Sequence, residues 1–261
     1  MTLAVCATPI GNLDDVTLRV LAELRAADVV LCEDTRHTRG LLERHGIEAT
    51  LLSYHEHNEA ARTAELLPRL EAGERMALVS DAGMPGISDP GARLIRAALG
   101  AGVPVTVLPG ASAVETALVA SGLVGDRYQF VGFLPRGVKP WPDLLAASPT
   151  VAFESPQRLP ATLRSLAEFA PELEVAVCRE LTKRFEEVVR GTAAELAVRF
   201  ADPPKGEIVL VLGPRGSEPD EDAALSVVSE LVEAGVPRKR AADLVARLTG
   251  VARNRLYRGS L

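Results

Sequence analysis

Aromatic side chains are scarce in this sequence and make up only 4% of its 261 residues. Hydrophobic residues nonetheless account for 47% of the chain and charged residues for 25%, the usual balance of a globular protein. The core must therefore consist mainly of leucine, valine and alanine. No uncharged apolar run reaches the length of about 18 residues that a membrane-spanning helix needs, so no membrane span is expected.

Cysteine is also rare, and a basic charge excess is absent. Cys6, Cys32 and Cys178 form no CxxC motif, and the N-terminus lacks a basic segment followed by an apolar one. This pattern predicts reduced thiols in a cytoplasmic protein, where they act as small buried hydrophobic side chains. The formal net charge is -6, so any contact with an acidic partner must be local. His55-Glu56-His57 lacks the HExxH spacing, and no metal site is expected.

The chain contains an alternation of short apolar runs and amphipathic segments. In the first half, strands are expected at 3–8, 28–32, 76–80 and 103–108, and helices at 16–26, 37–45, 59–72 and 92–101. Continuous apolar runs are typical of strands buried on both faces, and their alternation with helices predicts parallel βαβ units. In the second half, strands are expected at 128–133, 150–154, 174–179, 185–191 and 207–212. Only a polar turn separates 174–179 from 185–191, which predicts an antiparallel pair in a mixed sheet.

These patterns predict two α/β domains, residues 1–121 and 122–216, and a helical tail, residues 217–261. Pro135–Pro142 is expected to be a mobile loop and Ser217–Asp222 a linker. The tail is divided by charge: 217–235 contains six acidic residues and no Lys or Arg, whereas 236–261 contains seven basic residues and one aspartate. Gly235-Val236-Pro237 is predicted to separate two helices, and Gly250 to separate the second helix from a third at 251–257.

The tail therefore resembles a small helix-turn-helix unit. Ala241, Leu244, Val245 and Leu248 are expected to form its apolar face. Its basic face, with Tyr257, is predicted to contact RNA phosphates and to stack on bases. A basic cap on a dimer and a merely solvated face are the alternatives.

Four loops next to strands are candidates for ligand binding, because ligands of open parallel sheets bind at the carboxyl ends of the strands. They are Ala7–Leu13, Val79–Gly91, Leu108–Ala113 and Lys205–Glu207. The first is not GxGxxG, so a Rossmann NAD site is not supported. The second holds three glycines and two prolines, and its Asp89-Pro90 is expected to start the next helix. The third leads into a helix start with free N–H groups. Ordinary turns and close helix packing remain the alternatives for these loops.

Together with other segments, these loops resemble the tetrapyrrole-methylase superfamily of S-adenosylmethionine-dependent methyltransferases. Within it, the similarity is greatest to bacterial enzymes that methylate the 2′-hydroxyl of a cytidine in the decoding region of small-subunit ribosomal RNA. The first loop has fewer glycines than in porphyrin and precorrin methylases, which argues against a tetrapyrrole substrate. The resemblance is carried by Ala7–Leu13, Cys32–Arg36, Val79–Gly91, Leu108–Ala113, Phe133–Arg136, Phe153–Pro156 and Cys178–Lys183.

The resemblance implies a homodimer of chains with two α/β domains each, with S-adenosyl-L-methionine bound between the domains. It implies that the partner is small-subunit ribosomal RNA, either as naked RNA or within the small ribosomal subunit. The cofactor-binding residues that we expect are Pro9, Ser80, Asp81, Ala82, Gly83, Met84, Ser112, Ala113, Phe133, Gly206 and Glu207.

The expected reaction is in-line attack of a ribose hydroxyl on the donor's methyl group, which requires positioning and a proton acceptor. Glu33 and Asp34, at the end of the second strand, are the first candidates for the acceptor, and only one of them can face the cleft. Arg36 is expected to hold phosphate, and His55 is a second candidate base. Lys183 and Arg184 are candidates for RNA contact. A structural ion pair, an incidental histidine and a solvated turn are the alternatives. For the whole chain, the alternatives are a tetrapyrrole methylase and a non-catalytic RNA-binding assembly factor.

Overall fold

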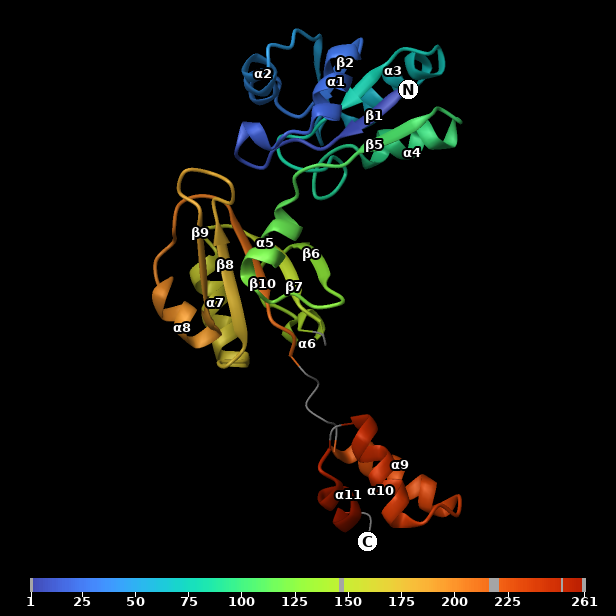
Figure 1. Cartoon of the computed structure of the whole chain (residues 1–261), viewed down its shortest axis with the longest axis vertical. Coiled ribbons are helices and arrows are strands. Elements are labelled where there is room, and N and C mark those ends of the chain that lie inside the picture. The colour runs from blue at the N-terminus through green and yellow to red at the C-terminus, as the bar shows by residue number, and fades with distance from the viewer. Residues whose placement is uncertain (1, 146–147, 216–220, 250, 260–261) are drawn as a thin grey trace. The chain divides into compact units, whose positions relative to one another are not determined.

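The computed structural model describes residues 2–145, 148–215, 221–249 and 251–259 (Figure 1). The chain divides into two compact units, Met1–Pro214 and Arg215–Leu261, and each is described by itself. Within the described residues, no helix is both long and apolar enough to cross a membrane.

The first sheet of the larger unit is parallel throughout, with the strand order β3-β2-β4-β1-β5. Every residue of β1, β2 and β4 is buried, because apolar clusters cover both faces of the sheet. This confirms the expectation drawn from the continuous apolar runs. The strands are β1 (Leu3–Cys6), β2 (Val29–Cys32), β3 (Leu51–Ser53), β4 (Met76–Leu78) and β5 (Val105–Leu108), and the helices are α1 (Leu18–Ala26), α2 (Thr35–Arg44), α3 (Glu59–Glu71) and α4 (Ala92–Gly100).

The second sheet is mixed, with the strand order β6-β7-β10-β8-β9. β6 and β7 are parallel, and the other neighbours are antiparallel, including the predicted pair β8 and β9. Its strands are β6 (Gln129–Phe133), β7 (Thr150–Glu154), β8 (Glu174–Arg179), β9 (Glu187–Thr192) and β10 (Ile208–Leu212). One face packs in an apolar cluster with α6 (Trp141–Leu144), α7 (Leu159–Phe169) and α8 (Ala193–Arg199).

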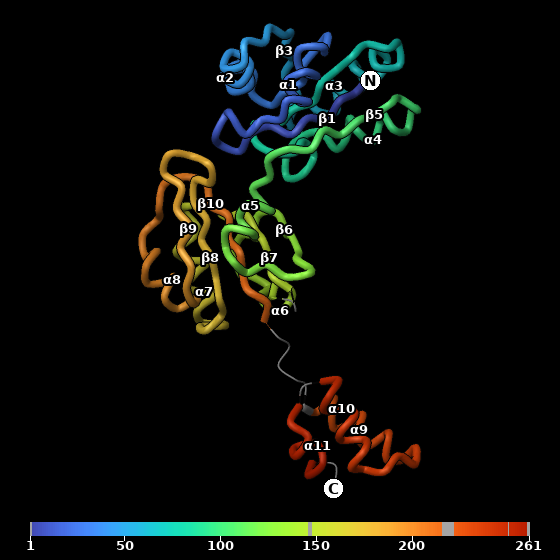
Figure 2. Tube along the Cα trace, viewed as in Figure 1, coloured from blue at the N-terminus to red at the C-terminus, as the bar shows by residue number. Residues whose placement is uncertain are grey.

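Helix α5 (Ala113–Ser121) connects the two sheets of this unit. It follows β5 of the first sheet directly in the chain, yet it lies beside the second sheet (Figure 2). Its buried side chains pack on that sheet. Val114, Ala117 and Leu118 lie in one cluster with Val151 of β7 and Val209 of β10. The N-terminus of α5 therefore lies where the strand-end loops of the first sheet meet the second sheet.

Several boundaries differ from the predictions for local reasons. Helix α2 begins at Thr35 rather than at 37, because the side chain of Asp34 accepts a hydrogen bond from the backbone N–H of Arg36 and caps the helix. Helix α4 begins at Ala92, with Gly91 as its N-cap, so Asp89 does not start it. The expected linker 217–222 lies partly outside the described residues, and its last two residues begin α9. β3, α7 and α8 were not predicted, and the expected loop 135–142 is shortened by α6.

The smaller unit consists of α9 (Glu221–Glu233), α10 (Arg238–Thr249) and α11 (Arg253–Gly259). The predicted break falls at Gly235, whose φ of 88° favours glycine. The predicted apolar face was partly wrong. Leu244 and Leu248 are 36% and 84% exposed, whereas Ala242 is buried with Ala241 and Val245, and these short side chains pack α10 in one cluster with residues of α9. The expected helix end at Gly250 lies outside the described residues.

All three cysteines are free and buried, as expected for small hydrophobic side chains. Burial raises the pKa of Cys6 and of Cys178 to about 12. A thiol with such a pKa is almost entirely protonated near neutral pH and is a poor nucleophile.

Candidate functional site

The three loops that follow β1, β4 and β5 meet in space. Strand β1 lies between β4 and β5, so their carboxyl ends are adjacent. Thr8 and Gly83 form an antiparallel bridge, in which each N–H donates to the other residue's carbonyl at 2.9 and 3.1 Å. The Thr8 hydroxyl donates to the Ser80 carbonyl at 2.9 Å. A Cβ on Gly110 would lie 2.9 Å from the Cβ of Ala7, so glycine permits this approach.

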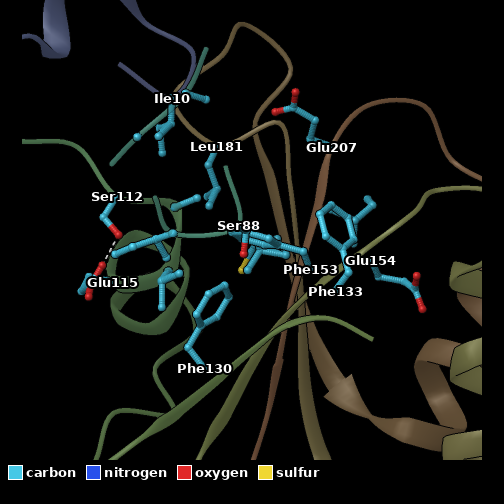
Figure 3. A pocket seen from close by; sticks show the side chains of 18 of the residues that line it. Ile10, Ser88, Ser112, Glu115, Phe130, Phe133, Phe153, Glu154, Leu181 and Glu207 are labelled. Atoms are coloured by element: carbon cyan, nitrogen blue, oxygen red, sulfur yellow. Dashed lines mark hydrogen bonds between the residues drawn. The ribbon is translucent and has the colours of Figure 1, made fainter. Parts of the chain in front are cut away.

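A cavity of about 890 Å³ opens next to these loops. Its wall combines the first-sheet loops, the first turn of α5 and the second sheet (Figure 3). This volume is typical of small-molecule sites. The predicted cofactor residues that line it are Ala82, Gly83, Met84, Ser112, Ala113, Phe133, Gly206 and Glu207.

Three predicted cofactor residues, Pro9, Ser80 and Asp81, are not part of the cavity wall, and they support it instead. Pro9 and Ser80 are buried. The Ser80 hydroxyl hydrogen bonds to the carbonyls of Ala82 and Gly83 at 3.4 Å. Asp81 accepts a hydrogen bond from the backbone N–H of Asp34 at 3.1 Å and so ties the β4 loop to the end of β2.

The second sheet supplies an apolar floor of the cavity, and most of the side chains in this floor were not predicted from the sequence. Phe130 and Phe153 meet edge to face with ring centroids 5.0 Å apart, and Phe133 and Phe153 do so at 5.4 Å. Leu181, Ile208 and Val209 add aliphatic surface. Three of the chain's six phenylalanines therefore line one cavity, and only Phe133 among them was predicted to bind the cofactor. A planar heterocycle fits such a surface.

The first turn of α5 forms a polar end of the cavity. Ser112 is the N-cap, but its side chain makes no capping hydrogen bond and instead donates to the carboxylate of Glu115. The Tyr128 hydroxyl donates to the same carboxylate at 2.7 Å. The hydrogen bond from Ser112 is the main cause that lowers the pKa of Glu115. The cavity therefore offers a charged carboxylate and an uncapped helix N-terminus side by side, which suit an ammonium and a carboxylate group.

The carboxyl groups of Glu33, Asp81 and Asp89 lie close together around the loop that follows β4. Burial, followed by the charge of Asp81, raises the pKa of Glu33, while His55 opposes this. Burial, followed by the charge of Glu33, raises the pKa of Asp89 to about 6, against a hydrogen bond from Ser80. Asp89 lines the cavity. Left-handed Ser88 and Gly91, with φ of 61° and 135°, flank it and turn the chain, so the sequence expectation of a helix start misplaced this carboxylate.

Asp34 and Arg36 differ from Glu33 in their surroundings. Arg36 donates two side-chain hydrogen bonds to the Asp34 carboxylate, at 3.1 and 2.7 Å, and its side chain is otherwise largely exposed. The Arg36 hydrogen bond holds the pKa of Asp34 well below its usual range. Asp34 also caps α2, so this pair has the geometry of a structural ion pair.

His55 lies between β3 and α3. Its backbone N–H donates to the Asn58 side chain at 2.9 Å, and its Nε2 lies 3.2 Å from the Asn58 amide nitrogen. Its Nδ1 is buried and has no hydrogen-bond partner among the described residues. His55 is thus close enough to influence Glu33, but neither lines the cavity.

The turn between β8 and β9 closes another side of the cavity. Lys183 forms ion pairs with Glu180 at 3.0 Å and with Glu207 at 2.9 Å. Gly206 has a φ of 96°, and a Cβ there would collide with the Glu180 side chain. Both its conformation and its surroundings therefore favour glycine.

Replacing Gly206 with alanine is expected to destabilise the protein by about 1–3 kcal/mol and to weaken ligand binding in the cavity, because Glu180 must leave its position. The control is Gly73→Ala, since Gly73 has a similar φ of 93° and open space around it. Denaturant unfolding and calorimetric titration measure the two effects. Equal ligand affinities in the two variants would contradict a role for the Glu180 contact.

Comparison with known proteins identifies the family. Residues 2–197 match the family model described as Tetrapyrrole (Corrin/Porphyrin) Methylases, and residues 218–259 match the RsmI C-terminal HTH domain. The chain is 45% identical to the ribosomal RNA small subunit methyltransferase I of Mesorhizobium japonicum, over 98% of this chain and 90% of that protein. The chain belongs to the tetrapyrrole methylase family and, within it, to the ribosomal RNA small subunit methyltransferases I. The resemblance expected from the strand-end loops is confirmed.

Other relatives agree. The enzyme of the same name from Neisseria meningitidis is 42% identical over 98% of this chain and 91% of its own length. Among solved structures, uroporphyrin-III-C-methyltransferase from Thermus thermophilus has a TM-score of 0.60 and 24% identity, over 81% of this chain and 94% of its own. Diphthine synthase has a TM-score of 0.62 at 18% identity, over 82% and 90% of the two chains. These two structures establish the fold alone.

Proposed function

We propose that this chain transfers a methyl group from S-adenosyl-L-methionine to the 2′-hydroxyl of a cytidine in the decoding region of small-subunit ribosomal RNA. The observation that carries the proposal is the similarity to small-subunit ribosomal RNA methyltransferases I, at 45% and 41% identity over 98% and 99% of this chain for two of them. The cavity supports the proposal because it has the size and the polar groups that such a donor requires.

The cavity wall fits the three parts of the methyl donor. The phenylalanine floor around Phe153 would hold the adenine, the first turn of α5 would hold the carboxylate, and Glu115 would hold the ammonium group. A uroporphyrin-III C-methyltransferase structure from Thermus thermophilus, with a TM-score of 0.59, is described as complexed with S-adenyl homocysteine, the demethylated product of such a donor. When bound, the donor supplies an electrophilic methyl group, so the protein's tasks are alignment and proton removal.

We assign the proton acceptor to Glu33. Its burial and its carboxylate neighbours raise its pKa toward the range in which a general base works best. Asp89, which lines the cavity and whose pKa is raised by burial and then by the charge of Glu33, is the group through which the proton leaves the ribose hydroxyl and reaches Glu33. The charge of His55 opposes the rise in the pKa of Glu33. Asp34 caps α2, and its partner Arg36 is exposed enough to bind an RNA phosphate.

We assign RNA binding to residues 217–261, with the two α/β parts, 1–121 and 122–216, holding the donor. In the smaller unit, exposed basic side chains lie on α10 and α11, among them Lys239, Arg240 and Arg247. A helical unit with such a surface binds nucleic acid through phosphates.

Replacing Lys239, Arg240 and Arg247 with glutamine is expected to weaken binding to small ribosomal subunits and to flatten its salt dependence. Each lost phosphate contact lowers the magnitude of the slope of log affinity against log salt by about 0.7–0.9, so the three substitutions together lower it by about 2–3. The control replaces Arg19, Arg96 and Arg164, which are exposed on α1, α4 and α7. An equal change in the control would place the RNA contact elsewhere.

We further propose that the chain forms a homodimer and acts in the cytoplasm, where ribosomal subunits are assembled. Exposed apolar side chains on the edge strand β5 and on α4, Val107 and Leu99, support self-association. Sedimentation of the purified chain measures its oligomeric state.

The proposed function is tested by incubating the chain with labelled methyl donor and small ribosomal subunits from cells that lack this enzyme, followed by mapping of the modified nucleotide. One methylated cytidine ribose is expected. A non-catalytic assembly factor would incorporate no methyl group, and a tetrapyrrole methylase would label a pigment but not RNA. Either result would overturn the proposal.

A further inference from the structure

The turn between β8 and β9 presents an aromatic ring to solvent. Phe185 is 65% exposed and belongs to none of the apolar clusters of the described residues. The guanidinium carbon of Arg184 lies over this ring, 5.6 Å from its centroid. Arg184 forms no ion pair within the part of the chain that the structure describes, so its charge is available to a partner. An exposed aromatic ring with a cation on it has no role in packing this chain.

The backbone of this turn is held tightly. Glu180 and Thr182 are in the left-handed conformation, with φ of 53° and 64°. The Thr182 N–H donates to the Glu186 carboxylate at 2.6 Å, and the Thr182 hydroxyl accepts from the Asn12 N–H at 3.0 Å. Such strained residues persist only where their surroundings fix them. The turn therefore holds Arg184 and Phe185 on a pre-organised support.

The turn between β8 and β9 adjoins the cavity in which the donor is proposed to bind. Leu181 and Lys183 of the same turn line the cavity, and Figure 3 shows Leu181 next to Ile10 at its upper side. Contact with the first sheet is close, since a Cβ on Gly11 would lie 2.9 Å from the Leu181 carbonyl oxygen. Phe185 is thus only two residues beyond the cavity wall along the chain.

We infer that Arg184 and Phe185 form a stacking surface for an unpaired RNA base that flanks the methylated nucleotide. The inference rests on the proposed function and adds a subsite to it. A ribose hydroxyl that reaches a donor in a pocket belongs to a nucleotide that has left its stack, and this costs stacking energy. An aromatic face restores that energy for any base, and an arginine plane extends the surface and binds phosphate.

A second copy of the chain fits this surface less well. One ring beside a charged guanidinium is a small apolar area, whereas stable dimer interfaces bury roughly 800 Å² on each partner and exclude charge from their centre. The single ring also matches one base. RNA is therefore the occupant that the chemistry of this turn favours.

The test compares Phe185→Ala, Phe185→Leu and Phe185→Trp in the full chain. Stacking predicts that Ala and Leu each raise KM for unmethylated small subunits about tenfold or more, and that Trp retains the wild-type KM. The affinity for the donor, measured by calorimetry, stays unchanged in all three. The control is Val198→Ala, which removes an apolar side chain that is 79% exposed on α8, outside the cavity wall.

A spectroscopic readout separates stacking from a structural role. The chain's single tryptophan, Trp141, is buried, so Phe185→Trp adds an exposed indole. Small subunits are expected to quench that fluorescence in proportion to their binding. An unchanged KM in Phe185→Ala, a leucine variant equal to wild type, loss of the dimer in sedimentation, or absent quenching would overturn the inference. Wild-type activity in the same assay shows that the proposed function stands when the stacking subsite fails, whereas an inactive wild type means that the proposed function itself fails.

Discussion

Replacing Glu33 with glutamine is expected to slow methyl transfer about a hundred- to a thousandfold, because a positioned general base contributes rate enhancement of this order. Glutamine keeps the size of the side chain but cannot accept the proton. The loss should appear in kcat, measured with saturating donor and small subunits. Donor affinity should change little, since Glu33 is not part of the cavity wall.

The pH dependence follows from the same carboxylates. A base must be deprotonated to act, so kcat/KM should fall as the pH drops through the apparent pKa values of the coupled pair, near the value of about 6 for Asp89. Glu33→Gln removes a negative charge that raises the pKa of Asp89, so the remaining acid limb should move to lower pH. A pH–rate profile between about pH 5 and 8 measures both effects.

Asp34→Asn is the matched control for this prediction. Asparagine preserves the N-cap of α2, and Arg36 already holds the pKa of Asp34 so low that it makes a weak base. We expect a loss of only a few-fold, from the weakened ion pair. A large loss in Asp34→Asn with little in Glu33→Gln would reverse the assignment of the base.

Replacing Ala113 with phenylalanine is expected to abolish donor binding. Ala113 is the first residue of α5 and lines the cavity, so a phenyl group there occupies the space between the helix terminus and the apolar floor. Displacing a packed ring weakens the binding free energy of the ligand by several kcal/mol, so its Kd should rise at least about a hundredfold. Calorimetric titration with the donor measures this, and methylation should fall in parallel.

Val119→Phe is the control for the blocking variant. Val119 lies on the same helix and is 70% exposed, so the same substitution adds bulk outside the cavity. Its donor affinity should remain that of the wild type, and both variants should unfold near the wild-type temperature. Wild-type donor affinity in Ala113→Phe would mean that the donor binds elsewhere.

The parallel sheet could be predicted because β1, β2 and β4 are continuous apolar runs, which only a sheet covered on both faces accommodates. The meeting of the three loops also follows from strand-end logic, because β1 pairs with both β4 and β5. The apolar runs and the loops that follow them can both be read directly from the sequence. They therefore located the Gly83 and Ala113 parts of the cavity.

The remaining parts of the site depend on contacts between distant segments. Phe130 and Phe153 reach the cavity only because α5 leaves the first sheet and packs on the second, and nothing within β6 or β7 encodes that choice. Asp89 was expected to start a helix, since an aspartate before proline commonly does. The positive φ of Ser88 and Gly91 redirected it, and backbone turns of this kind are decided by tertiary packing.

The route of α5 has a thermodynamic consequence. Helix α5 packs on the second sheet, and its first turn lines the cavity, whose wall also includes loops of the first sheet. A ligand in this cavity contacts both sheets at once, so its binding free energy depends on how the two sheets are positioned relative to each other. Occupancy should therefore protect amide hydrogens in both sheets from exchange, far beyond the residues it touches.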